Sequence, residues 1–104
     1  MAWIILIISG VFEAVWATAL GRSDGFSRLT PSVVFAVGLV ASMAGLAYAM
    51  RSLPVGTAYA VWVGIGAVLT VAYAMATGDE SASWMKIVLL GVIVGGVVGL
   101  KFLH

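Results

Sequence analysis

Long apolar runs alternate with short polar segments along the whole chain. Each run approaches the roughly 17–25 residues that a helix needs to cross the hydrocarbon core of a bilayer. The runs are separated by three segments with turn-forming glycine or proline and most of the charged residues: GRSDGFSRLTPS, RSLPVG and GDESAS. The pattern predicts one domain over residues 1–104, with four membrane-spanning helices at about 3–20, 32–50, 55–77 and 84–103.

The fold class predicted by this pattern is all-α. No segment alternates apolar and polar residues over about ten positions, as the strands of a membrane β-barrel do. Because the RSLPVG linker is short, the second and third helices are expected to be antiparallel neighbours. Pro54 then falls in the first turn of the third helix, where proline is tolerated.

Composition supports an integral membrane protein. The chain is 63% hydrophobic and 9% charged, against about 45–50% and about 25% in soluble domains, and its mean hydropathy is +1.21. The ATA at residues 17–19 resembles a signal-peptide cleavage site. A signal peptide, however, has a cationic start and an unbroken apolar stretch, whereas this chain begins MAW and carries Glu13. We therefore interpret the first run as a membrane span.

Several kinds of chemistry have no residues to support them. There is no cysteine for a disulfide or a thiolate metal site, and His104 is the one histidine. No phosphate-binding loop, nucleophile triad or pair of carboxylates stands out within one chain. The sequence thus argues against an enzyme, and we expect no metal, no cofactor and no nucleic acid partner.

The basic residues are almost evenly divided between the two sides of the membrane. Arg51 and Lys101 fall on one side, and Arg22, Arg28 and Lys86 on the other. Because an excess of Lys and Arg in cytoplasmic loops orients membrane proteins, this balance predicts insertion in both directions. Inverted repeats in transporters place one site at the midplane of the bilayer. Since the chain has no internal repeat, an antiparallel homodimer would supply the inversion.

Glu13 is an isolated acid in the middle of the first apolar run. An acid at the centre of a span costs about 2.5–3.5 kcal/mol on insertion scales, which the apolar residues around it offset. Acids inside membrane spans mark ion or proton pathways by default. The alternative is a protonated glutamate that only hydrogen-bonds to a neighbouring helix, but we favour the functional interpretation.

Polar and aromatic residues share one face with this acid. Ser9, Glu13, Trp16 and Leu20 follow one another at spacings of four, three and four, which places them on one side of a helix. A hydroxyl and an indole therefore flank the carboxylate.

The third helix offers a matching face with Tyr59, Trp62 and Gly66. Interfacial belts explain Trp3 and Trp84, but not Trp62, which lies about 12 Å beyond the start of the helix, deep in the bilayer core. An indole there needs a partner for its N–H or a cation for its face, although a packing role stays open.

Small residues mark places of close approach. In the second helix Gly38, Ser42 and Gly45 form a strip that another helix or a substrate can approach. In the third, Gly64 and Gly66 predict either a hinge or close packing. We group four residues as supporting or hinge residues: Ser9, Gly10, Gly64 and Gly66.

The fourth helix carries glycines at four-residue intervals without a polar group among them. Such faces serve close helix packing, so we predict dimerisation through this helix. The glycines concerned are Gly91, Gly95 and Gly99.

These features together resemble the small multidrug resistance family of bacterial proton-coupled exporters, over essentially the whole chain. The features are the four short spans, the central glutamate and the specific segment LPVGTAYAVWVGIGAV at residues 53–68. Within the family, FEAVWATAL, GFSRLTPS and the terminal GLK are similar to the guanidinium exporter subtype. The quaternary ammonium subtype generally has a small residue where Trp16 stands.

The resemblance implies an antiparallel, dual-topology homodimer in the bacterial inner membrane, in which the two copies of Glu13 form one site used alternately by protons and substrate. Trp16, Ser42, Tyr59 and Trp62 would line that site. Ser42 would belong to the polar network that holds the carboxylates, and Tyr59 would link the site to the gate.

The chain departs from the subtype at two places in its loops. Gly21 replaces a lysine that is common at the end of the first helix, and Arg22 follows it. The third loop keeps an acid at Glu80 without the proline expected after it. These departures concern the loops and the topology more than the binding site.

The predicted function is proton-coupled export of guanidinium. A guanidinium ion is planar and cationic, its parallel N–H groups fit a carboxylate, and its face stacks on an indole. Export of quaternary ammonium or other multidrug cations is the alternative within the family. Substituted guanidinium substrates, pairing with a paralogous chain, a passive cation channel and a regulatory membrane subunit also stay open.

Overall fold

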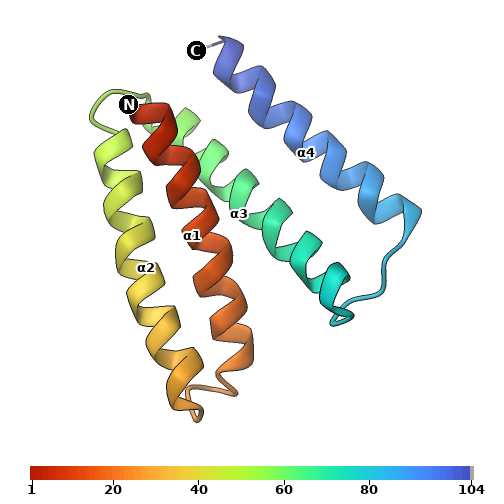
Figure 1. The fold of residues 1–104 in the computed structure, drawn as a ribbon. Helices are drawn as coiled ribbons and strands as arrows, with labels where there is room; N and C mark the ends of the chain where they lie inside the picture. The colour runs from red at the N-terminus through yellow and green to blue at the C-terminus, as the bar shows by residue number, and fades with distance from the viewer. Residues whose placement is uncertain (104) are drawn as a thin grey trace.

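The computed structural model describes residues 1–103, and these form four α-helices, so that the all-α prediction is confirmed (Figure 1). His104 lies outside the described residues. The helices are 20 to 23 residues long, about 30–35 Å at 1.5 Å per residue, and each is long and apolar enough to cross a membrane. They are α1 (Ala2–Arg22), α2 (Leu29–Ala49), α3 (Val55–Thr77) and α4 (Trp84–Leu103).

The second helix begins about one turn earlier than predicted, at Leu29 instead of residue 32. Pro31 therefore lies inside its first turn rather than in the preceding loop. A proline is accommodated there because the N–H groups of the first turn have no partner within the helix. α1 also continues beyond its predicted end, to Arg22.

α1 lies between α2 and α3 and packs against both, whereas α4 packs only against α3 (Figure 1). The N-terminus, the α2–α3 connection and the end of α4 gather at one end of the bundle, and the other two connections lie toward the opposite end. None of the residues of α4 is buried. The chain thus consists of a packed three-helix unit with a fourth helix along one side.

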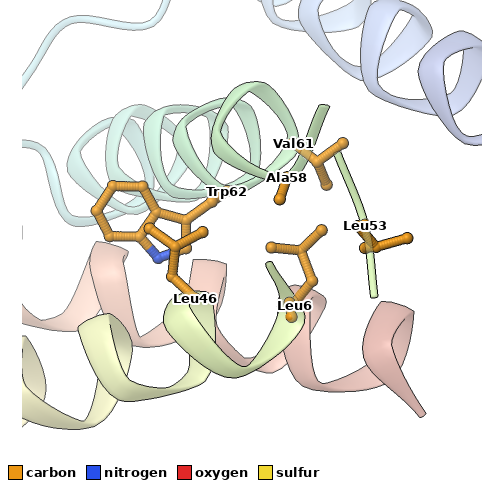
Figure 2. Close-up of a cluster of buried hydrophobic side chains, with 7 residues drawn as sticks. Leu6, Leu46, Leu53, Ala58, Val61 and Trp62 are labelled. Carbon is orange, nitrogen blue, oxygen red and sulfur yellow. The ribbon is translucent and has the colours of Figure 1, made fainter. Parts of the chain in front are cut away.

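The apolar core occupies the end of the three-helix unit that is nearer the N-terminus. Figure 2 shows this cluster between α3 and the other two helices, with Trp62 at one end and Leu53 at the other. Because Trp62 lies in the third turn of α3, the cluster ends near the middle of the bundle. Its buried members are Leu6, Leu46, Ala49, Leu53, Ala58, Val61 and Trp62.

The α1–α2 connection is a compact turn with a left-handed backbone. Asp24, Gly25 and Phe26 have φ values of 52°, 68° and 70°, which only glycine adopts without strain. The buried Ser23 holds the turn, since its hydroxyl donates to the Leu20 carbonyl at 2.8 Å and accepts from the Phe26 N–H at 3.2 Å.

An ion pair joins this end of α1 to the α3–α4 connection. One guanidinium nitrogen of Arg22 lies 3.1 Å from a carboxylate oxygen of Asp79, and both side chains are about half exposed. The Arg22 guanidinium also lies 5.4 Å from the centre of the Tyr73 ring. Arg22, which follows the departure at Gly21, is thus paired with an acid of the α3–α4 connection.

Candidate functional site

Glu13 lies at the middle of α1, on the side that faces α3. The contact is so close that a Cβ atom added to Gly66 would overlap the carboxylate, so glycine at this point of α3 makes room for the acid. Glu13 is half-buried, and its Oε1 atom is buried with no hydrogen-bond donor among residues 1–103. A buried acceptor of this kind is unusual, because most buried polar atoms in proteins are paired.

Trp16 lies one turn further along α1 and contacts α2. A Cβ added to Gly38 would lie 3.1 Å from the Cβ of Trp16, and the Trp16 and Phe35 rings meet edge to face with 5.8 Å between ring centres. The Trp16 Nε1 atom is buried and has no acceptor in the described part of the chain. The acid and the indole therefore leave one acceptor and one donor unpaired, three residues apart.

Phe35 is a site neighbour that the sequence analysis missed. It precedes Gly38 by three residues and Ser42 by seven, so it continues the strip of small residues along the same face of α2. This spacing would have identified it. The strip was defined by small residues alone and so does not include Phe35. The Trp16 indole, however, packs both beside the small Gly38 and against the Phe35 ring.

Ser42 connects the three packed helices through a chain of hydrogen bonds. The Trp62 indole N–H donates to the Ser42 hydroxyl at 2.9 Å, and that hydroxyl donates to the Ser9 backbone carbonyl at 2.7 Å. Ser9 in turn donates its own hydroxyl to the Ile5 carbonyl at 2.7 Å. Because a serine has one hydroxyl proton, Ser42 within a single chain orients Trp62 and donates nothing to Glu13.

Trp62 and Tyr59 form the part of the site contributed by α3. Trp62 is 5% exposed, in keeping with the expectation that its indole needs a partner inside the bilayer. Tyr59 lies one turn away, with its ring centre 5.8 Å from that of Trp62 and the two planes tilted by 37°. At 54% exposure, Tyr59 lies at the rim of the three-helix unit.

The structure brings most of the predicted site residues into one layer across α1, α2 and α3, which we call the Glu13 layer. Its members are Ser9, Glu13, Trp16, Ser42, Tyr59 and Trp62. Gly10 supports this layer, since a Cβ added to it would lie 2.8 Å from the Ile65 side chain. α3 runs as one helix through Gly64 and Gly66, both buried at close helix contacts. Close packing is thus observed at these glycines, and the hinge stays a prediction.

The glycines of α4 lie apart from this layer. Within residues 1–103, a Cβ added to any of them would meet no atom within 4 Å. Their predicted role in dimerisation therefore concerns a surface that this chain leaves open. These residues are Gly91, Gly95 and Gly99.

Two apolar grooves flank the other side of α1. Their volumes are about 570 and 580 Å³, and both include Val11, on the face of α1 turned away from Glu13. Arg22 and Lys101 provide the charged groups at their ends, and neither groove contains an acid. Since a cation needs a negative partner, we assign the candidate site to the Glu13 layer. Residues 1–103 contain no group of three or more His, Cys, Asp or Glu side chains able to hold a metal ion.

Comparison with known proteins places this chain among small membrane exporters. Residues 1–93 match the family model described as Small Multidrug Resistance protein. The chain is 56% identical to the guanidinium exporter of Yersinia pestis, with 97% of each chain covered. It is 54% identical to the guanidinium exporter of Escherichia coli (strain K12), and 52% to that of Salmonella typhimurium, covering 97% of this chain and 96% of each relative.

The names of these relatives agree with the prediction of a transporter rather than an enzyme. The four candidate spans and the match over nearly the whole chain agree with a multi-pass protein of the bacterial inner membrane. On the family match and these identities, the chain belongs to the small multidrug resistance family.

Proposed function

We propose that this chain exports guanidinium ions in exchange for protons, and that Glu13 binds the proton and the cation in turn. The observation that carries the proposal is the buried Glu13 Oε1 atom, which has no donor among residues 1–103 and lies in the middle of a membrane span. The curated relatives that cover almost the whole chain bear the name guanidinium exporter, which supports the choice of cation.

The chemistry around Glu13 suits a flat cation with N–H donors. A guanidinium ion offers parallel N–H groups that pair with the two oxygens of a carboxylate. Its faces are attracted to aromatic rings, and both Trp16 and Trp62 lie in the same layer as the acid. Trp62 is fixed by its hydrogen bond to Ser42, so its ring presents a constant surface to the ion.

Exchange follows if the carboxylate holds either a proton or the cation. When guanidinium binds, the Glu13 proton leaves to the side of the membrane that the site faces, and a proton returns when the cation is released. If the loaded forms reorient between the two sides and the empty form does not, an inward proton gradient drives export by alternating access. Gly64 and Gly66 are the proposed hinge for that reorientation.

The proposed transporter is an antiparallel homodimer. α4 is apolar, yet none of its residues is buried, which leaves a long surface for a second copy. An inverted copy also brings a second Glu13, whose carboxylate supplies an acceptor for the unpaired Trp16 N–H. Contact between the α4 helices would run along Gly91, Gly95 and Gly99.

The remaining proposed roles follow from position. Glu13 binds proton and cation, and Trp16 and Trp62 provide aromatic faces. Ser42 orients Trp62, and Tyr59, at the exposed rim, links the site to the gate. Ser9 and Gly10 support the layer at the contacts that α1 makes with α2 and α3.

The test is electrical recording from the purified protein in liposomes. We expect guanidinium to drive a larger current than tetraethylammonium, and the current to depend on the proton gradient. Methylguanidinium and phenylguanidinium in the same assay distinguish the simple ion from substituted ones. Glu80→Gln, an exposed acid in the α3–α4 connection, should behave as the unchanged protein.

Four other results would contradict the proposal in distinct ways. A larger tetraethylammonium current indicates a multidrug exporter of the same family. Current without dependence on the proton gradient indicates a passive channel. No transport by the chain alone, even after a paralogous chain is added, indicates a regulatory subunit. Transport that appears only when a paralogous chain is added indicates a heterodimer.

A further inference from the structure

Three consecutive residues of α3 contact two different helices. A Cβ added to Gly64 would lie 2.7 Å from a methyl carbon of Val97 in α4. Ile65 packs on Gly10 of α1, and Gly66 lies against the Glu13 carboxylate. Because residues two apart in a helix point to roughly opposite sides, Gly64 and Gly66 make α3 a thin wall between α4 and the acid.

This wall brings α4 close to the acid. Of the other described helices, α4 packs only against α3. Between α4 and α1, the Lys101 ammonium lies 5.9 Å from the centre of the Trp3 ring. That interaction is ten residues from Glu13, or about 15 Å along α1. Gly64, by contrast, is two residues from Gly66, and a Cβ added to it would lie 2.7 Å from Val97 and 3.5 Å from Ile93.

We propose that Val97 is a positioning residue for the Glu13 site: seated on Gly64, it holds α3 so that Gly66 sets the place of the carboxylate. The inference rests on the proposed function, because the property it explains is the affinity for the cation. Val97 touches neither Glu13 nor the cation. A valine suits the task because its branched side chain is stiff and transmits a displacement instead of absorbing it.

The consequence for transport is that packing on α4 adjusts the affinity of a site on α1. Hydrogen bonds from a flat cation to a carboxylate weaken steeply when the geometry is poor, and misplacement by about 1 Å is costly to function. A change at Val97 is therefore expected to alter the KM for guanidinium more than the maximal rate.

The experiment is a double-mutant cycle in the full-length protein. Gly64→Ala adds a methyl group where Val97 lies, and Val97→Ala removes the obstructing methyl groups. We expect each single change to raise the KM for guanidinium by about threefold to tenfold, within the range of coupling between contacting residues. The double variant should return close to the unchanged protein, because the added methyl group fills the space that valine leaves.

Matched controls make the same chemical changes where α3 and α4 do not touch. Gly56→Ala adds a methyl group to α3 in open space. Val37→Ala shortens a valine of α2 that is 65% exposed and lines neither groove. Both controls should keep the KM of the unchanged protein. Elution as a single species in detergent establishes that each variant is intact, and calorimetry measures its affinity for guanidinium.

Two results would overturn the inference. One is a Val97→Ala protein whose KM equals that of Val37→Ala, which decides the matter even if Gly64→Ala does not fold. The other is a double variant whose effect is the sum of the two single effects. Failure of the proposed function is distinguishable, because the unchanged protein would then neither bind nor transport guanidinium.

Discussion

Two groups of polar side chains lie close together in the three-helix unit and differ in how their hydrogen bonds are used. Ser9, Ser42 and Trp62 are buried, and every polar side-chain atom among them has a partner. Glu13 and Trp16 lie in the next turns of α1, and each leaves a buried atom unpaired. The first group behaves as scaffold, whereas the second keeps its bonding capacity for something the single chain does not contain.

The difference has an energetic meaning. A buried polar atom without a partner costs about 1–3 kcal/mol, whereas a paired one contributes about 0.5–1.5 kcal/mol. The paired cluster therefore stabilises the bundle that holds the second group in place. The unpaired group carries a cost in the single chain, which the binding proposed for Glu13 would recover.

The largest expected effect comes from removing the charge of the unpaired group. Glu13→Gln keeps the size of the side chain but binds neither a proton nor a cation, so we expect coupled transport to be abolished in a folded protein. Guanidinium-driven proton flux in proteoliposomes is the measurement. Glu80→Gln is the control, and flux that survives in Glu13→Gln would assign the acid to the scaffold.

The next effect comes from converting the paired cluster into an unpaired one. Ser42→Ala leaves the buried Trp62 N–H without an acceptor, so stability should fall by about 1–3 kcal/mol. Unfolding in mixed micelles measures this loss. The control is Ser32→Ala, which removes an exposed hydroxyl that donates to the Arg28 carbonyl at the start of the same helix. It should change stability far less. Equal losses would mean that Ser42 has no special place.

A smaller effect is expected at the indole of the unpaired group. Trp16→Gly removes an aromatic face and opens space beside Gly38 and Phe35, so preference should shift toward bulkier cations. A shift of about threefold to tenfold is what loss of a cation–π contact gives. The ratio of phenylguanidinium to guanidinium currents measures it. Trp84→Gly, at an exposed indole, is the control, and an unchanged ratio would make Trp16 a packing residue.

The smallest effect is expected outside both groups, at the ion pair between the loops. Asp79→Asn removes the charge that faces Arg22, but exposed ion pairs contribute little because water and salt screen them. Stability and guanidinium KM should stay within experimental error at physiological salt. A clear loss of transport would show that the two loops must be joined for the cycle.

The sequence predicted the elements of the fold because its signals are strong and local. Four apolar runs of spanning length have few alternative structures in a bilayer, where backbone groups must be paired within the chain. Helical spacing also placed Ser9, Glu13 and Trp16 on one face without knowledge of the neighbours. The boundary error at Pro31 arose because proline is read as a loop signal, although the first helical turn accepts it.

The partners of these residues could not be predicted from spacing. Ser42 was expected to hold carboxylates, and in the single chain its proton goes to the Ser9 carbonyl. Which atom it reaches depends on how far α2 is shifted along α1, and periodicity within one helix does not report that shift. The same holds for Arg22 and Asp79, which are 57 residues apart.

The exposure of α4 has a consequence for how the protein is made. Chains are synthesised from the N-terminus, and earlier segments can fold while later ones are still on the ribosome. α1, α2 and α3 provide the side chains of the Glu13 layer, so these side chains can come together before α4 enters the bilayer. The last helix then arrives beside an assembled layer, and the contact of Val97 with Gly64 forms last.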